Sequence, residues 1–141
     1  MMITRRFLNG ALIAGALGGV SVGILAVSAP PVWAANTTVP FSAEAFKAAQ
    51  ASGSPILVEI HADWCPTCKA QNPILDKLTS ATKFKDLKVF RVDFDAMKPV
   101  VKQFGAQMQS TLIVFKGTAE QGRSVGDTKE ASIEALLDKS L

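Results

Sequence analysis

Cys65 and Cys68 are the only cysteines in this chain of 141 residues, and just two residues separate them. A Cys-x-x-Cys pair that follows an apolar run and opens a helix is typical of redox chemistry. Unpaired backbone N–H groups and the positive end of the helix dipole favour the thiolate of the first cysteine at such a position. We therefore expect Cys65 to be a nucleophile with a lowered pKa, and Cys68, one turn further along, to be the resolving thiol.

The pair has two other conceivable uses, a structural disulfide and half of a zinc site. A disulfide across so short a loop removes little chain entropy and adds little stability. A structural zinc ion normally takes four protein ligands, whereas this chain offers two cysteines and one histidine, His61. A zinc site would need a carboxylate or a second chain, so the redox interpretation is preferred. We expect no bound metal and no cofactor.

The elements that must position the pair follow from the apolar pattern of the chain. Residues 56–61 have few polar breaks, which is typical of a strand that is covered on both faces. The other expected elements are a helix that Ser42 caps, helices over 65–82, 99–104 and 132–141, and strands over 87–94, 111–115 and about 121–125. Two parallel strands joined by a helix make a βαβ unit. The pattern therefore predicts an α/β fold, with a small mixed sheet flanked by helices on both faces.

The order and spacing of several motifs resemble the thioredoxin family over residues 40–141. The matching segments are Ala62–Lys69 around the cysteines, Pro73-Ile74-Leu75, Val92-Asp93, Phe104-Gly105, Thr111–Gly117 and Val125-Gly126. The resemblance implies a thioredoxin fold, with a mixed central β-sheet. It also implies thiol–disulfide exchange on protein disulfides, in which Cys65 attacks and Cys68 resolves the mixed disulfide.

Ser110 is the first departure from the family pattern, because the family places a cis-proline against the disulfide at this position, before Thr111. A cis bond before a non-proline residue costs about 2.5–4 kcal/mol. We expect the Gln109–Ser110 bond to be cis, since the flanking register is intact and the fold could enforce it; the alternative is a trans bond with a reshaped loop. In the functional interpretation, Ser110 adds a hydroxyl beside Cys65 and, with Thr111, tunes substrate docking. The alternative is that the serine is neutral sequence drift that the loop tolerates.

The other departures are His61 and the dipeptide Pro66-Thr67. His61 stands where the family usually has an aromatic residue, and an imidazolium there would stabilise a thiolate and shuttle protons. The simpler interpretation is a hydrogen-bonded, partly exposed histidine. Pro66-Thr67 replaces the Gly-Pro of cytoplasmic thioredoxins, and the residues between the cysteines tune the reduction potential.

Two further residues fit the family pattern. Glu59 matches the carboxylate that thioredoxins bury behind the second cysteine, where it would act as the base that deprotonates Cys68. The alternative is an exposed glutamate on the polar face of the strand. We expect Trp64 to cover the thiol and to offer a surface to partners; the alternative is a packing role.

Residues 1–34 have the pattern of an export signal. Thr4-Arg5-Arg6 is followed by an uncharged stretch over 7–29 and by Val32-Trp33-Ala34, which has small residues at the two positions that a signal peptidase reads. We expect cleavage after Ala34 and a domain over 35–141. The leader also resembles a twin-arginine signal. The alternative is an uncleaved membrane anchor, but five glycines make the uncharged stretch only mildly hydrophobic, which favours a cleaved leader. The domain is then periplasmic or otherwise extracytoplasmic.

Charge and compartment limit the partners. The net charge is +3, with two of the positive charges in the leader and the lysines scattered over several elements, so we expect no nucleic acid partner. In an oxidising compartment a reducing protein needs a dedicated electron supply, which predicts a membrane thiol-reductant donor. We expect a monomer that reduces or exchanges protein disulfides. The alternatives are a metal-binding or chaperone-like module and a domain with a vestigial cysteine pair.

Overall fold

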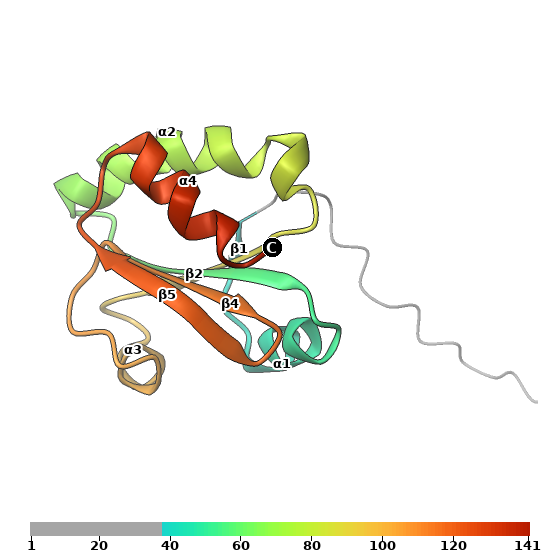
Figure 1. The fold of residues 1–141 in the computed structure, drawn as a ribbon. Coiled ribbons are helices and arrows are strands. Elements are labelled where there is room, and N and C mark those ends of the chain that lie inside the picture. The colour runs from blue at the N-terminus through green and yellow to red at the C-terminus, as the bar shows by residue number, and fades with distance from the viewer. Residues whose placement is uncertain (1–37) are drawn as a thin grey trace, which may run out of the picture. The chain divides into compact units, whose positions relative to one another are not determined.

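The computed structural model describes residues 38–141, which form a five-stranded mixed sheet with helices on both faces (Figure 1). The strands are β1 (Val39–Pro40), β2 (Pro55–His61), β3 (Lys88–Asp93), β4 (Thr111–Lys116) and β5 (Ala119–Val125). The helices are α1 (Ala43–Ala51), α2 (Pro66–Thr79), α3 (Lys98–Gln103) and α4 (Glu130–Asp138), with a 3-10 turn η1 (Thr82–Phe84). The expected leader and its cleavage site lie outside the described residues.

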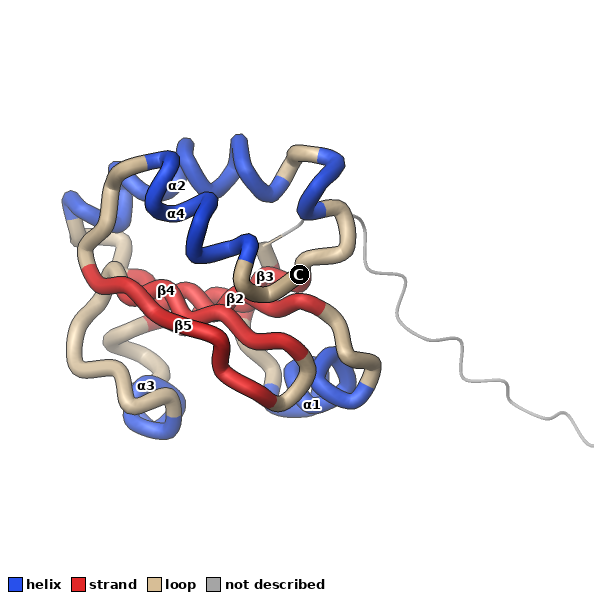
Figure 2. The backbone as a smooth tube through the Cα atoms, viewed as in Figure 1, coloured by secondary structure: helices blue, strands red, loops and turns tan. Residues whose placement is uncertain are grey.

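The strand order in the sheet is β1-β3-β2-β4-β5. The strands β1 and β2 both run parallel to β3, whereas β4 is antiparallel to β2 and to β5. The strands β2, β3, β4 and β5 lie together in one layer between the helices (Figure 2). The predicted β2–α2–β3 unit is therefore present, and the predicted α/β class with a mixed sheet is confirmed. The pair β4 and β5 forms the predicted hairpin.

Strict alternation of side chains divides the core between the two faces of the sheet. On the face covered by α1 and α3, an edge-to-face aromatic cluster consists of Phe41, Phe46, Phe90, Phe104 and Phe115. On the face covered by α2 and α4, Leu57 and Val89 pack with the leucines of both helices. Because side chains alternate with period two, Glu59 and His61 share the face of Leu57, and Arg91 shares that of Val89. The fold thus places three polar side chains under α2.

Local features of the chain account for the ends of two helices. Helix α2 ends at Thr79, three residues before the predicted end, where the Thr79 and Ser80 hydroxyls donate to carbonyls one turn back. Such bonds compete with continuation of the helix. Helix α3 ends before Gly105, whose φ of 61° is the left-handed conformation that glycine commonly adopts directly after a helix.

None of the helices formed by residues 38–141 is both long enough and apolar enough to cross a membrane.

Candidate active site

Cys65 is the N-cap residue of helix α2, and its sulfur takes part in the capping. The Sγ atom accepts the backbone N–H of Cys68 at 3.1 Å. Pro66 follows as the first helical residue, where its missing N–H leaves no donor unpaired and its fixed φ suits the helix. Both cysteines are free thiols and only 1% exposed. The predicted position of Cys65 at the start of a helix is confirmed.

The two thiols differ in how easily they ionise. Burial by itself would raise the pKa of Cys65, but hydrogen bonds from the Cys68 side chain, the Ser110 hydroxyl and the backbone of Cys68 and Thr67 outweigh it and lower that pKa. Burial raises the pKa of Cys68, and the neighbouring Cys65 sulfur raises it further, while Ser110 opposes both effects. The lowered pKa of Cys65 agrees with the expectation from the sequence. Cys65 therefore forms the thiolate first and is the thiol equipped to attack.

Ser110 contacts both sulfurs, although not through the backbone geometry that the sequence suggested. Its hydroxyl oxygen lies 3.1 Å from Cys65 Sγ and 3.3 Å from Cys68 Sγ. Residues 38–141 contain no cis peptide bond, so the expectation of a cis Gln109–Ser110 bond was wrong. Unlike proline, Ser110 has an N–H, which donates to the Ile60 carbonyl at 2.8 Å. A left-handed φ of 60° at Ser110 accompanies this bond.

Gln71 is a site residue that sequence reasoning missed. It is fully buried in α2, and its Nε2 donates to the Ser110 carbonyl at 3.3 Å and to the Asp127 carbonyl at 2.8 Å. Gln71 lies one helical turn before Leu75 and two before Leu78, on the face that packs against the sheet. A polar residue on that face needs a buried partner, and this was the signal that could have found it.

Glu59 is buried, as predicted, and only 1% exposed. Arg91, its register partner in β3, donates from Nε to Oε2 at 2.9 Å and from Nη2 to Oε1 at 3.4 Å. His61 Nδ1 lies 3.1 Å from Oε1. Within residues 38–141 the hydrogen-bond partners of this carboxylate are thus Arg91 and His61 rather than Cys68. The role of Glu59 as the base for Cys68 stays a prediction.

His61 lies between two carboxylates. Its Nδ1 faces Glu59, and its Nε2 lies 3.2 Å from Oδ1 of Asp63, which is almost fully exposed. Ionised carboxylates only accept, so both contacts are hydrogen bonds only when each ring nitrogen carries a proton. The histidine is hydrogen-bonded, as the simpler interpretation held, but it is buried rather than partly exposed. Its proposed role towards the thiolate stays a prediction.

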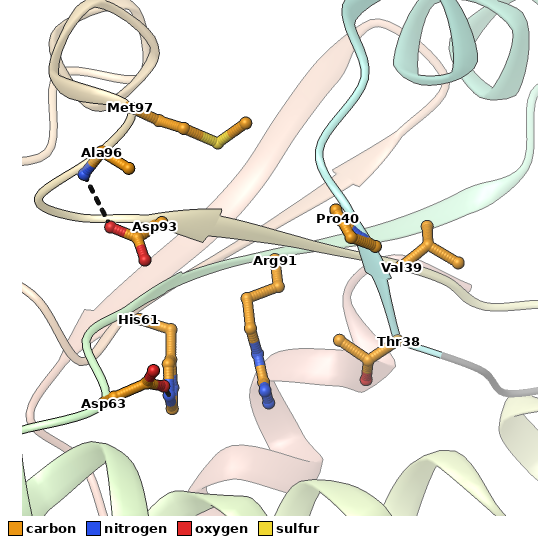
Figure 3. Close-up of a pocket in the computed structure, with 9 residues that line it drawn as sticks. All are labelled: Thr38, Val39, Pro40, His61, Asp63, Arg91, Asp93, Ala96 and Met97. Carbon is orange, nitrogen blue, oxygen red and sulfur yellow. Dashed lines mark hydrogen bonds and ion pairs between the residues drawn. The ribbon is translucent and has the colours of Figure 1, made fainter.

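A pocket of about 400 Å³ borders this polar network (Figure 3). The His61 and Arg91 side chains extend into it from neighbouring strands, Asp63 lies beside the imidazole, and Thr38 lines the opposite side. The Glu59–Arg91 pair therefore has its cationic partner at the wall of a pocket, while the carboxylate itself is buried.

The remaining predicted site residues surround the cysteine pair. Trp64 is more than half exposed, and its Nε1 donates to Asp95 Oδ2 at 2.7 Å, which lowers the pKa of that carboxyl. Thr111 begins β4, and its hydroxyl donates to the Met108 carbonyl at 2.7 Å, which closes the loop before Ser110.

Within the described part of the chain, no group of three or more His, Cys, Asp or Glu side chains is placed to hold a metal ion.

This fold and this pair of thiols define a thiol–disulfide oxidoreductase. The thioredoxin family profile matches residues 37–139, and the chain belongs to the thioredoxin family. Among curated relatives, it is 39% identical over 93 residues to a thioredoxin H-type of Brassica campestris, which covers 66% of this chain and 73% of the relative. It is 32% identical over 96 residues to thioredoxin Asp f 29 of Aspergillus fumigatus, which covers 67% of this chain and 86% of the relative.

Solved structures agree with this assignment. The chain is similar to Trxlp from Edwardsiella tarda EIB202, with a TM-score of 0.70 and 42% identity over 72% of this chain and 98% of that chain. It is also similar to the thioredoxin NaTrxh from Nicotiana alata, with a TM-score of 0.65 and 25% identity over 76% of this chain and 95% of that chain. The predicted fold, family and enzyme class are confirmed.

Proposed function

We propose that this protein is an extracytoplasmic thiol–disulfide oxidoreductase that reduces or exchanges the disulfides of other proteins. The observation that carries the proposal is the unequal pair of thiols at the start of α2, with the pKa of Cys65 lowered and that of Cys68 raised. Cys65, the thiol with the lower pKa, attacks a disulfide in the first step. Cys68, the thiol with the higher pKa, is the nucleophile of the second step.

Protein substrates are supported by the apolar surface around the sulfurs. Trp64, next to Cys65, and Met108, two residues before Ser110, are both more than half exposed. Val125 is equally exposed and pairs with Thr111 at the start of β4. Exposed apolar groups of this kind are typical of surfaces that bind other proteins. A match of 42% over 72 residues to the protein disulfide-isomerase erp38 of Neurospora crassa also supports disulfide exchange, although it covers only 20% of that protein.

The location and the electron supply rest on the leader. The charged start, the uncharged stretch and the small residues up to Ala34 support export and cleavage. A reductase outside the cytoplasm is reoxidised by its surroundings, so we propose that a membrane thiol-reductant donor keeps the pair reduced and that the domain acts as a monomer.

Direction and substrates are tested in two experiments. Equilibration with glutathione buffers measures the reduction potential of the Cys65–Cys68 disulfide, and we expect a reducing value; a strongly oxidising one would reverse the proposed direction. Trapping in the native host uses Cys68→Ala, which should hold substrates as mixed disulfides on Cys65. The matched control is the variant that also carries Cys65→Ala. Fractionation of the same cells tests the location, and a cytoplasmic protein would contradict the export proposal.

A further inference from the structure

The Ser110 hydroxyl lies between the two reacting sulfurs. Within residues 38–141 its oxygen has two hydrogen-bond partners, Cys65 Sγ at 3.1 Å and Cys68 Sγ at 3.3 Å. All three groups are buried, so the interaction is stronger than it would be in water. A hydroxyl carries one proton and can donate it to only one of the two sulfurs at a time.

The backbone of Ser110 is held from three sides. Its N–H donates to the Ile60 carbonyl at 2.8 Å, and its carbonyl accepts the N–H of Gly126 at 2.9 Å and Nε2 of Gln71 at 3.3 Å. A φ of 60° is unfavourable for a serine and persists only where the surroundings enforce it. These bonds from β2, α2 and the turn after β5 fix the hydroxyl at the sulfurs.

We propose that Ser110 is a catalytic residue whose single O–H serves the two thiolates in turn, first Cys65 during attack and then Cys68 during resolution. The proposal rests on thiol–disulfide exchange at this pair and on nothing about location or direction.

In the first step, the Cys65 thiolate bonds to one sulfur of the substrate disulfide. The substrate S–S bond breaks, and the other sulfur leaves as a thiolate with the electron pair. Cys65 Sγ is then uncharged and a weak acceptor, so the Ser110 hydroxyl turns to Cys68. Cys68 gives its proton to solvent and attacks Cys65 Sγ, and the second substrate sulfur leaves as a thiolate. The substrate disulfide is reduced, and the cysteine pair is oxidised.

The surroundings of Cys68 explain why this second donation matters. Burial and the neighbouring Cys65 raise the pKa of Cys68, and the Ser110 hydroxyl is among the groups that oppose the rise. Within residues 38–141 the Glu59 carboxylate is hydrogen-bonded to Arg91 and His61 and not to the Cys68 sulfur. Because the Ser110 hydroxyl can donate to whichever sulfur is ionised, it stabilises the buried Cys68 thiolate during the second step.

Ser110→Gly is the sharpest test, because it removes the hydroxyl and glycine adopts a positive φ without strain. The matched control is Thr79→Val, which removes another buried hydroxyl; it donates to the Leu75 carbonyl and, within residues 38–141, has no hydrogen bond to a sulfur. Loss of a hydrogen bond to a thiolate should move the midpoint of a pH profile up by about one pH unit. At a pH below the midpoint, the ionised fraction of the thiol is then about tenfold lower in the variant. The more basic thiolate is about threefold more reactive, so the rate of each step falls about threefold.

The two steps are measured separately. Alkylation of Cys65 by iodoacetamide across a range of pH reports the first thiolate. For the second, a small chromogenic aromatic disulfide is loaded on Cys65 at acid pH, and a jump to neutral pH is followed by release of the second chromogenic thiol. We expect Ser110→Gly to shift the alkylation profile and to slow the release, while Thr79→Val changes neither.

The proposal is overturned if Ser110→Gly matches Thr79→Val in both measurements, or if only the first step changes. Circular dichroism verifies that each variant folds, and Ser110→Ala replaces the glycine variant if the latter is unstable. Both probes are small reagents, so a failure of the protein on protein disulfides or in localisation leaves these rates unaffected. The two proposals can therefore fail independently.

Discussion

Replacement of Arg91 by methionine tests whether the buried Glu59 carboxylate depends on its ion pair. Arg91→Met keeps an unbranched apolar stem but removes the guanidinium that donates to both carboxylate oxygens. Removal of one partner from a buried pair costs roughly 3–5 kcal/mol, because the other charge stays buried and uncompensated. Arg91 is itself 37% exposed and His61 remains as a partner, so we expect the low end, about 3 kcal/mol.

The chain contains a matched control for this experiment. Arg123 pairs with Glu120 through the same Nε contact and is also 37% exposed, but its partner is 35% exposed, whereas Glu59 is 1% exposed. Exposed pairs contribute about 0–1 kcal/mol. Arg123→Met should therefore cost less than about 1 kcal/mol. The contrast between the two variants reports the burial of the Glu59 carboxylate together with the hydrogen bond that Arg91 donates to Asn72.

Urea and thermal unfolding of the reduced protein measure both costs. A loss of about 3 kcal/mol corresponds to a Tm lower by roughly 12–24 °C in a domain of about 100 residues. The double variant with Glu59→Gln should lose less than the sum of the two single variants, because no charge is left buried. The reasoning is refuted if Arg91→Met costs no more than Arg123→Met, since solvent or His61 would then already compensate Glu59.

Three other expectations concern the thiols, the aromatic core and the start of α4. Below the usual thiol pKa, iodoacetamide should modify Cys65 faster than Cys68, because the pKa of Cys65 is lowered and that of Cys68 raised; equal rates in peptide mapping would contradict this. Phe46→Ala should cost about 3–5 kcal/mol in urea unfolding, since three rings pack edge to face on Phe46. The Ser132 hydroxyl and the Lys129 N–H lower the pKa of Asp127. Loss of these two hydrogen bonds in Asp127→Ala should cost roughly 1 kcal/mol at neutral pH. The difference disappears as the pH falls through the lowered pKa; a constant difference down to acid pH would contradict the role of the charge.

The fold and the reacting pair could be predicted from the sequence because both depend on local pattern. The apolar run before Cys65, the proline after it and the spacing to Cys68 determine a strand, a turn and a helix start within one short segment. Alternation in 87–94 and the continuous apolar run over 111–115 then predict the neighbouring strands. The burial of Glu59 also followed, because the run around it is apolar on both sides.

The partners of the buried polar groups could not be predicted in this way, because strand register and loop geometry bring them together. Arg91 reaches Glu59 since β2 and β3 pair with these two residues in register. Gln71 reaches Ser110 across 39 positions of the chain.

Ser110 shows the same limit most clearly. The sequence alone determined that a residue other than proline lies before Thr111. Only the tertiary structure decided that its peptide bond is trans, with its N–H bonded to Ile60 and its hydroxyl between the two sulfurs. An unfavourable backbone conformation at a single residue persists where the surrounding structure enforces it. The contacts from β2, α2 and the turn after β5, and not the local sequence, therefore determine the conformation of Ser110.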